Sequence, residues 1–211
     1  MKLPRTHDPH RVERAPAPGL RRRHFWLLGT WPGLAALPAC TSAPKPEHYR
    51  HEVPALDLRR YFDGKLTAHG IFRDRSGTVV RRFVVDMSGQ WSGAPGAEQG
   101  VLDERFTYLD RERAGQTERR VWHLRRLPGN GAVAQYEGTA DDVVGTARGE
   151  TAGNAFHWGY TLRLPVDGRV VEVDLDDWMF LVDERTMLNH AGMRKWGVHL
   201  GDVLITFTRA P

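Results

Sequence analysis

Short runs of alternating apolar and polar residues follow one another from 58 to 207, and this pattern constrains the fold more than any other feature. Successive side chains of a strand point to opposite faces, so such alternation indicates strands with one buried face. Helical patterns with a period of 3.6 residues are absent. Turn sequences rich in Gly, Asp and Asn separate the runs, at Asp74-Arg75-Ser76-Gly77, Arg113-Ala114-Gly115-Gln116, Pro128-Gly129-Asn130-Gly131 and Asp167-Gly168.

The runs predict nine or ten strands joined by short turns. We expect them over residues 65–72, 78–86, 101–109, 118–127, 132–139, 146–151, 155–164, 169–175 (extended over 178–182 after a bulge at Asp176-Asp177), 187–195 and 203–208. An antiparallel meander hides its edges by closing on itself. The predicted fold class is therefore all-β, an antiparallel meandering barrel of the calycin or lipocalin type with about eight to ten strands, wide enough to hold a small ligand. A two-sheet sandwich is the alternative, and the one helix expected is a short turn over 56–62 that plugs one end.

The first 39 residues differ from the rest and predict a signal peptide. A polar, basic stretch reaches Arg21-Arg22-Arg23, a short apolar run spans 25–36, and small residues follow. The apolar run is too short to cross a bilayer, which takes about 20 residues. Arg22 and Arg23, within Arg22-Arg23-His24-Phe25, resemble the core of a twin-arginine signal, and the choice between this export route and the general one stays open.

Cys40 is the only cysteine of the chain, so it has no partner for an internal disulfide. Leu37-Pro38-Ala39-Cys40 resembles the lipobox of bacterial lipoproteins. The resemblance implies cleavage between Ala39 and Cys40 and acylation of Cys40, with palmitate among the expected acyl groups, and hence a membrane anchor. Thr41 stands where an Asp would retain a lipoprotein in the inner membrane. The expected location is the cell envelope, at the outer membrane facing the periplasm.

The charge of the chain argues against a nucleic-acid partner once the leader is removed. The whole chain carries a net charge of +4, but the leader holds seven of its basic and two of its acidic residues, which leaves about −1 for residues 40–211. Residues 40–56, rich in Pro, His and Glu, are predicted to form a flexible tether behind the acylated cysteine. Residues 57–211 are then a single barrel domain.

Motifs of known chemistry do not occur in the sequence. It contains no Gly-x-Ser-x-Gly, no His-Glu-x-x-His, no cysteine pair and no glycine-rich phosphate loop. No catalytic residue, metal or cofactor is therefore predicted. The acidic run Asp174-Leu175-Asp176-Asp177-Trp178 leaves two interpretations open: a hard-cation site, or carboxylates that serve a turn and nearby arginines.

Tryptophans and isolated polar residues in the strand patterns are the candidates for ligand binding. Large aromatic side chains inside a barrel suit an acyl chain, and polar residues among apolar ones suit its head group, although both sets could instead fill the core or form a structural network. The candidate ligand-binding residues are Trp122, Trp158, Trp178, Asn154, Asn189 and Lys195.

Several segments together resemble the DUF3833 family of bacterial lipoproteins, whose function is unknown. The matching segments are Tyr61-Phe62-Asp63-Gly64, Gly70-Ile71-Phe72, Tyr136-Glu137-Gly138-Thr139-Ala140, Asp142-Val143-Val144-Gly145-Thr146-Ala147, Gly153-Asn154-Ala155, Asp176-Asp177-Trp178-Met179 and Asn189-His190-Ala191-Gly192-Met193-Arg194-Lys195-Trp196-Gly197. The resemblance implies a lipocalin-like barrel behind a lipoprotein signal and supplies no catalytic residues.

Three functional hypotheses follow. The first is a lipid-anchored protein that binds a fatty acid or phospholipid in the barrel, without chemistry of its own. The second is a structural lipoprotein with a solid barrel that docks a protein partner, whose identity the sequence does not give. The third is a lipid-modifying enzyme that uses the acidic run with a strand histidine.

Overall fold

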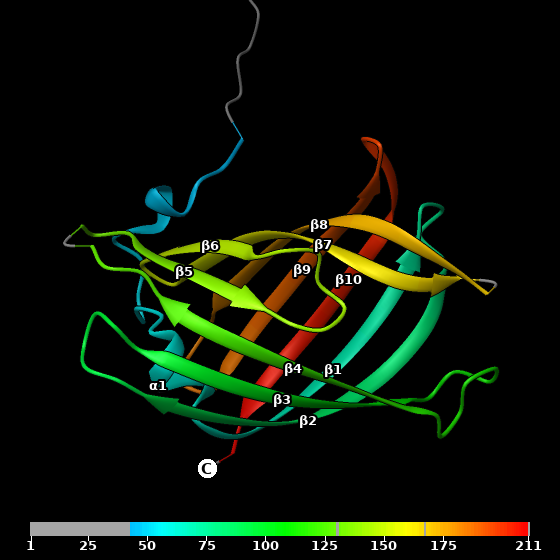
Figure 1. Cartoon of the computed structure of the whole chain (residues 1–211), viewed down its shortest axis with the longest axis horizontal. Helices are drawn as coiled ribbons and strands as arrows, with labels where there is room; N and C mark the ends of the chain where they lie inside the picture. The colour runs from blue at the N-terminus through cyan, green and yellow to red at the C-terminus, as the bar shows by residue number, and fades with distance from the viewer. Residues whose placement is uncertain (1–42, 130, 167, 211) are drawn as a thin grey trace, which may run out of the picture. The chain divides into compact units, whose positions relative to one another are not determined.

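The computed structural model describes residues 43–129, 131–166 and 168–210, which form a closed antiparallel barrel of ten strands (Figure 1). The predicted all-β barrel is confirmed. The elements are η1 (Pro46–Tyr49), α1 (Leu58–Phe62), β1 (Gly64–Asp74), β2 (Val79–Ser92), β3 (Gln99–Tyr108), β4 (Thr117–Arg126), β5 (Ala134–Thr139), β6 (Ala147–Ala152), β7 (Ala155–Val166), β8 (Arg169–Leu181), β9 (Thr186–Lys195) and β10 (Val198–Arg209).

The strand order is a simple meander. Each strand pairs with the next one along the chain, and β1 closes the barrel against β10, with Phe72 opposite Val203. One prediction about register is wrong: β8 has no bulge at Asp176-Asp177, because its pairing with β7 and β9 continues through both residues. Strict alternation therefore places Asp177 inside the barrel, between Leu175 and Met179, while Asp176 lies outside.

Glycines on β5 and β6 make room for the largest side chain of the interior. A Cβ on Gly138 would lie 2.8 Å from the ring of Trp158, and one on Gly149 would overlap the same side chain. Trp158 is only 5% exposed and lies across these two strands. The small residues of β5 and β6 thus let the barrel wall approach the tryptophan closely.

Helix α1 closes one end of the barrel (Figure 1), as the short turn expected over 56–62 predicts. Its residues Leu58, Tyr61 and Phe62 are 2%, 3% and 5% exposed. The Tyr61 hydroxyl donates to the carbonyl oxygens of Arg185 (3.0 Å) and Phe207 (3.2 Å). These contacts join the helix to the β8–β9 turn and to β10 and hold it as a plug.

The N-cap of α1 gives a testable contribution to stability. The Asp57 carboxylate accepts a hydrogen bond from the backbone N–H of Arg60 at 2.9 Å. Asp57→Ala is expected to lower the free energy of unfolding by about 1 kcal/mol, which is roughly 2–4 °C in Tm for a domain of this size. Asp63→Ala at the other end of the helix removes no such cap and serves as the control in thermal melts; an equal loss there would contradict the assignment.

The segment that precedes α1 packs on the barrel instead of hanging free. The Leu56 amide donates to the Gly153 carbonyl at 2.7 Å, and the ring centroid of Tyr49 lies 5.2 Å from that of Phe180 on β8. This differs from the flexible tether predicted over 40–56, because aromatic and apolar side chains within it find partners on β6 to β8. The leader residues Arg22, Arg23, Ala39 and Cys40 lie outside the described residues, and no described helix is long and apolar enough to cross a membrane.

Candidate ligand-binding cavity

The barrel encloses a cavity of about 600 Å³. Its lining residues come from β1, β2, β3, β4, β7, β8, β9 and β10, and they extend to the strand ends at Tyr108, Val166 and Lys195. These ends lie opposite the plug α1 (Figure 1). The cavity therefore opens at the end formed by the β1–β2, β3–β4, β7–β8 and β9–β10 turns, called the mouth below.

Most of the cavity wall is apolar. Alternation along each strand directs a row of aliphatic and aromatic side chains inward. Trp122 and Trp158 lie together in the wall, with ring centroids 4.7 Å apart, and Tyr160 meets both rings edge-on at 5.5 and 5.6 Å. Other apolar wall residues are Phe83, Val85, Met87, Phe106, Leu162, Leu164, Val171, Val173, Leu175, Met179, Ala191, Met193, Val203, Ile205 and Phe207.

A partly buried ion-pair group interrupts this apolar wall on β3 and β4. The Arg120 guanidinium holds Asp142 through Nη2–Oδ2 and Nε–Oδ2 distances of 2.6 and 2.9 Å. Its Nη1 lies 3.9 Å from Oε2 of Glu104. Glu104 is 8% exposed, lines the cavity and makes no side-chain hydrogen bond to any described residue. One guanidinium therefore serves two carboxylates, and the carboxylate of Glu104 is the less well satisfied.

A second polar group lies on β7, β8 and β9. The Tyr160 hydroxyl donates to Oδ2 of Asp177 at 3.0 Å, and the Asn189 amide donates to Oδ1 of the same carboxylate. The Asn189 amide also donates to the Trp178 carbonyl at 3.1 Å. Asp177 and Asn189 are 4% and 5% exposed, so this network satisfies polar groups that water does not reach freely.

Burial changes the protonation of both carboxyl groups. Desolvation raises the pKa of Glu104 to about 7, against the lowering effect of Arg120, with further raising from Asp142 and Asp177. Desolvation likewise raises the pKa of Asp177 to about 6, although Tyr160 and Asn189 stabilise its charged form. Burial and the neighbouring Asp177 raise the pKa of Tyr160 well above its usual value. Near neutral pH, the cavity thus contains carboxyl groups that change charge.

Cationic side chains line the mouth. Arg81 lies 3.2 Å from Glu112, and Arg113 pairs with Glu118 and stacks over the Tyr108 ring. Lys195 differs from these two arginines, because its ammonium donates to the Glu172 carbonyl oxygen at 3.1 Å and lies 4.7 Å from the Trp196 ring centroid. Among the described residues no carboxylate lies within 4 Å of Lys195.

The structure brings four of the six predicted binding residues to the cavity: Trp122, Trp158, Asn189 and Lys195. Binding by them stays a prediction. Two placements are wrong. Trp178 lies on the outer face, stacked on His157 at 4.3 Å, because its neighbours Asp177 and Met179 take the inward positions. Asn154 lies in the β6–β7 turn, where its amide donates to the Leu181 carbonyl at 3.1 Å.

Sequence reasoning missed Glu104, Arg120 and Tyr160 as cavity residues. In the strand expected over 101–109, alternation puts Glu104 on the same face as Leu102, Phe106 and Tyr108, and a charged residue in such an apolar row is the available signal. The same alternation along β4 puts Arg120 on the inward face, because Trp122 lies two residues after it. A charge that shares the buried face of a strand needs a partner, and these two charges are partners across β3 and β4.

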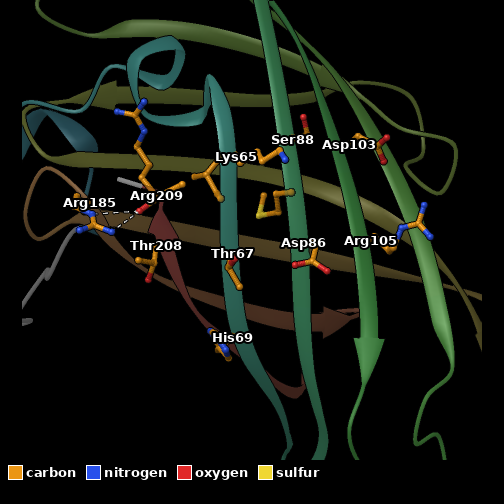
Figure 2. A pocket seen from close by; sticks show the side chains of 13 residues that line it. Lys65, Thr67, His69, Asp86, Ser88, Asp103, Arg105, Arg185, Thr208 and Arg209 are labelled. Atoms are coloured by element: carbon orange, nitrogen blue, oxygen red, sulfur yellow. Dashed lines mark hydrogen bonds between the residues drawn. The ribbon is translucent and has the colours of Figure 1, made fainter.

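A larger hollow, of about 820 Å³, lies on the outer surface of β1, β2, β3 and β10 (Figure 2). Its labelled side chains, including His69, Asp86 and Arg105, are spread over the four strands and do not converge on a point (Figure 2). Asp103 is held by Arg119 through two hydrogen bonds of 2.8 Å. This hollow lacks the enclosed apolar wall of the interior cavity, which is therefore the better candidate site.

The acidic run of β8 is divided between the two faces of the barrel. Asp174 accepts from the Thr161 hydroxyl at 2.8 Å, and Asp176 contacts His157 at 2.6 Å, both outside. Asp177 alone points inward. Within residues 43–129, 131–166 and 168–210, no three His, Cys, Asp or Glu side chains are grouped so that they could hold a metal ion.

Comparisons with known proteins agree with this fold. The model of DUF3833, a protein family of unknown function, matches residues 34–209. The structure is similar to the S-type phycobiliprotein lyase CPES from Guillardia theta, with a TM-score of 0.54 and 8% identity over 80% of this chain and 99% of that chain. At this identity the likeness concerns the fold alone. No curated protein sequence matches the chain.

Proposed function

The chain belongs to the DUF3833 family, whose function is unknown, and we propose that its barrel binds an envelope lipid with a long acyl chain. The observation that carries the proposal is the cavity of about 600 Å³, open at the mouth and closed by α1. Its volume falls within the usual range of small-molecule sites, roughly 300–1,000 Å³. An open apolar cavity favours a binding protein over the alternative of a solid docking barrel.

The mouth supports an orientation for the ligand. An acyl chain would enter toward Trp122 and Trp158, leaving its polar end at the level of Lys195 and Arg113. The Lys195 ammonium would then face the carboxylate of a fatty acid or the phosphate of a phospholipid. Glu104 and Asp177 lie deeper in the cavity, where a carboxylate head group would meet like charge, and this supports placing the head at the mouth.

Membrane anchoring belongs to the same proposal. The lipobox-like Leu37-Pro38-Ala39-Cys40 supports acylation at Cys40 and a location in the bacterial envelope, at the outer membrane facing the periplasm. In this setting the protein would hold or carry a lipid between membrane sites. Metabolic labelling with a palmitate analogue, which is expected to mark the wild type and not Cys40→Ser, tests the anchor separately from the cavity.

Acid–base chemistry on the bound lipid is a second candidate. It is favoured by one observation: Glu104 and Asp177, whose pKa values are raised to about 7 and 6, both line the same cavity. Groups that titrate near neutral pH are suited to proton transfer. A lipid whose mass differs between wild type and Glu104→Gln would support this candidate, and identical lipids would remove it.

Native mass spectrometry of residues 42–211, which form one compact unit, tests the binding proposal. The protein, produced in a bacterial periplasm, is expected to carry a lipid of defined mass. Ile205→Trp adds a ring to the cavity wall and should reduce lipid occupancy about tenfold or more, since the chain and the indole compete for one volume. Val101→Trp, on the outer face of β3, is the matched control and should keep the lipid. A folded wild type that is empty and ignores added fatty acids and phospholipids would overturn the proposal.

A further inference from the structure

Part of one outer wall of the barrel, toward its plugged end, is apolar, whereas ion pairs such as Arg194–Asp176 occupy the same strands nearer the mouth. Outward residues of an antiparallel sheet normally face water and are polar, and on β3 and β4 they form ion pairs such as Arg119–Asp103 at 2.8 Å. On β8, β9, β10 and β1 the outward positions include Phe180, Leu188, Leu204 and Ile71. These four residues form what we call the apolar wall, and Leu188 is 47% exposed.

Strand register makes the apolar wall continuous. Phe180 lies opposite Leu188, and Leu204 lies opposite Ile71. Leu188 is opposite Thr206, so it is a diagonal neighbour of Leu204 across β9 and β10. The wall borders a groove of about 600 Å³, whose ionisable lining residues among those described are His69, Arg82 and His190, and His190 contacts the Asp202 carboxylate at 2.9 Å.

Aromatic side chains lie at the plugged end of the apolar wall and, beyond the outward Arg194 of β9, at the mouth end of the same strands. At the plugged end, Tyr49 of η1 packs edge-on against Phe180 and Trp178, with centroid distances of 5.2 and 6.0 Å. At the mouth end, Trp196 in the β9–β10 turn is 89% exposed, and Val198 beside it is 58% exposed. Tryptophan and tyrosine favour the boundary between hydrocarbon and water, because they combine an apolar ring with a polar group.

The path of the chain points to the occupant of this wall. Tyr49 contacts Phe180 in the apolar wall, and the first described residue, Ala43, comes only three positions after Cys40. Three extended residues span at most about 11 Å. A lipid on Cys40, which is part of the proposed function, would therefore enter its membrane close to the segment that packs against this wall.

We propose that the apolar wall of β8, β9, β10 and β1 rests on the surface of a bilayer that contains anionic phospholipid. The apolar residues would enter the interfacial region of the bilayer, and the Arg82 guanidinium, which lines the groove, would face the lipid head groups. In this orientation the Trp196 turn, next to the mouth, meets the same surface, so a lipid could pass between membrane and cavity. The barrel would thus be held on its side by two attachments, the acyl chains on Cys40 and the apolar wall.

Vesicle flotation of the unacylated piece 42–211 tests the wall without the anchor. The wild type is expected to float with vesicles of phosphatidylethanolamine and phosphatidylglycerol, and less with phosphatidylcholine alone. Leu188→Glu and Trp196→Glu should each weaken binding about tenfold or more, because each removes the burial of one large apolar side chain. Val101→Glu, at a 40% exposed position on the outer face of β3, should leave binding unchanged.

Other occupants give different results. If a second copy covers the wall, sedimentation velocity shows a dimer that Leu188→Glu dissociates, without binding to vesicles. If a protein partner covers it, the piece is a monomer that floats with neither vesicle. Either result overturns the proposal. Leu188→Glu should still bind an acyl ligand in vesicle-free buffer, so failure of the wall and failure of the cavity are distinguished.

Discussion

Replacing Arg120 with Met should lower the free energy of unfolding at pH 8 by about 3 kcal/mol, the low end of the cost of removing one partner from a buried ion pair, because the Arg120 and Asp142 side chains are partly exposed. The guanidinium holds Asp142 through Nε and Nη2 and lies 3.9 Å from Glu104. Without it, both carboxylates lose their only nearby cation among the described residues. Denaturant unfolding of wild type and variant, followed by tryptophan fluorescence, measures the difference.

A double-mutant cycle separates this electrostatic effect from the loss of packing. Glu104→Gln in the Arg120→Met background should recover part of the lost free energy of unfolding, because it removes one of the two carboxylates left without an ion-pair partner. Arg119→Met is the control: Arg119 is the preceding residue, pairs with Asp103 at 2.8 Å, and its side chain is 61% exposed. An exposed pair contributes little, so an equally large loss at Arg119 would contradict the role of burial.

The Glu104→Gln variant should be more stable than the wild type at pH 8 and nearly equal to it at pH 5. The pKa of Glu104 is raised from 4.5 to about 7, so the folded protein binds this proton more tightly than the unfolded chain. The stability that protonation provides is complete below the unfolded pKa and is lost as the pH rises through 7. The loss is about 3 kcal/mol at pH 8, or roughly 6–12 °C in Tm for a domain of this size.

Thermal melts of both proteins from pH 5 to pH 8 check this expectation. Glu172→Gln is the matched control, since the Glu172 side chain is 58% exposed and outside the cavity. The pKa of Asp177 is raised from 3.8 to about 6, so ionisation of its carboxyl also lowers the free energy of unfolding, but at a lower pH than for Glu104. Some decline of stability with rising pH should therefore remain in Glu104→Gln. A wild type whose Tm does not fall between pH 6 and pH 8 relative to this variant would contradict the buried, protonated Glu104.

The barrel could be predicted from the sequence because alternation and turn residues are local signals. The run from Arg169 to Leu175 predicts a strand with one buried face, and β8 spans it in the structure. Its continuation was less predictable: two adjacent aspartates resemble a turn, but Asp177 is tolerated inside because Tyr160 and Asn189 donate to it. Those donors come from β7 and β9, so only pairing across strands makes the position acceptable.

The candidate site could be predicted in part for the same reason. Trp122 and Trp158 belong to strands whose inward face is apolar, and both line the cavity. Trp178 belongs to an equally apolar stretch, Trp178-Met179-Phe180, in which composition does not distinguish inside from outside. The assumed bulge shifted the expected phase by one residue, and such a shift exchanges the two faces of a strand.

The plug α1 makes the barrel a tube with a single opening. Leu58, Tyr61 and Phe62 are almost fully buried at the closed end, and the Tyr61 hydroxyl is hydrogen-bonded to the β8–β9 turn and to β10. On the proposed function, a bound lipid would therefore have to leave by the opening through which it entered, with its last part to enter emerging first. A second lipid could not displace the bound one from behind, so loading and unloading would be separate events. The closed end thus favours a carrier of one lipid at a time over a conduit within that proposal.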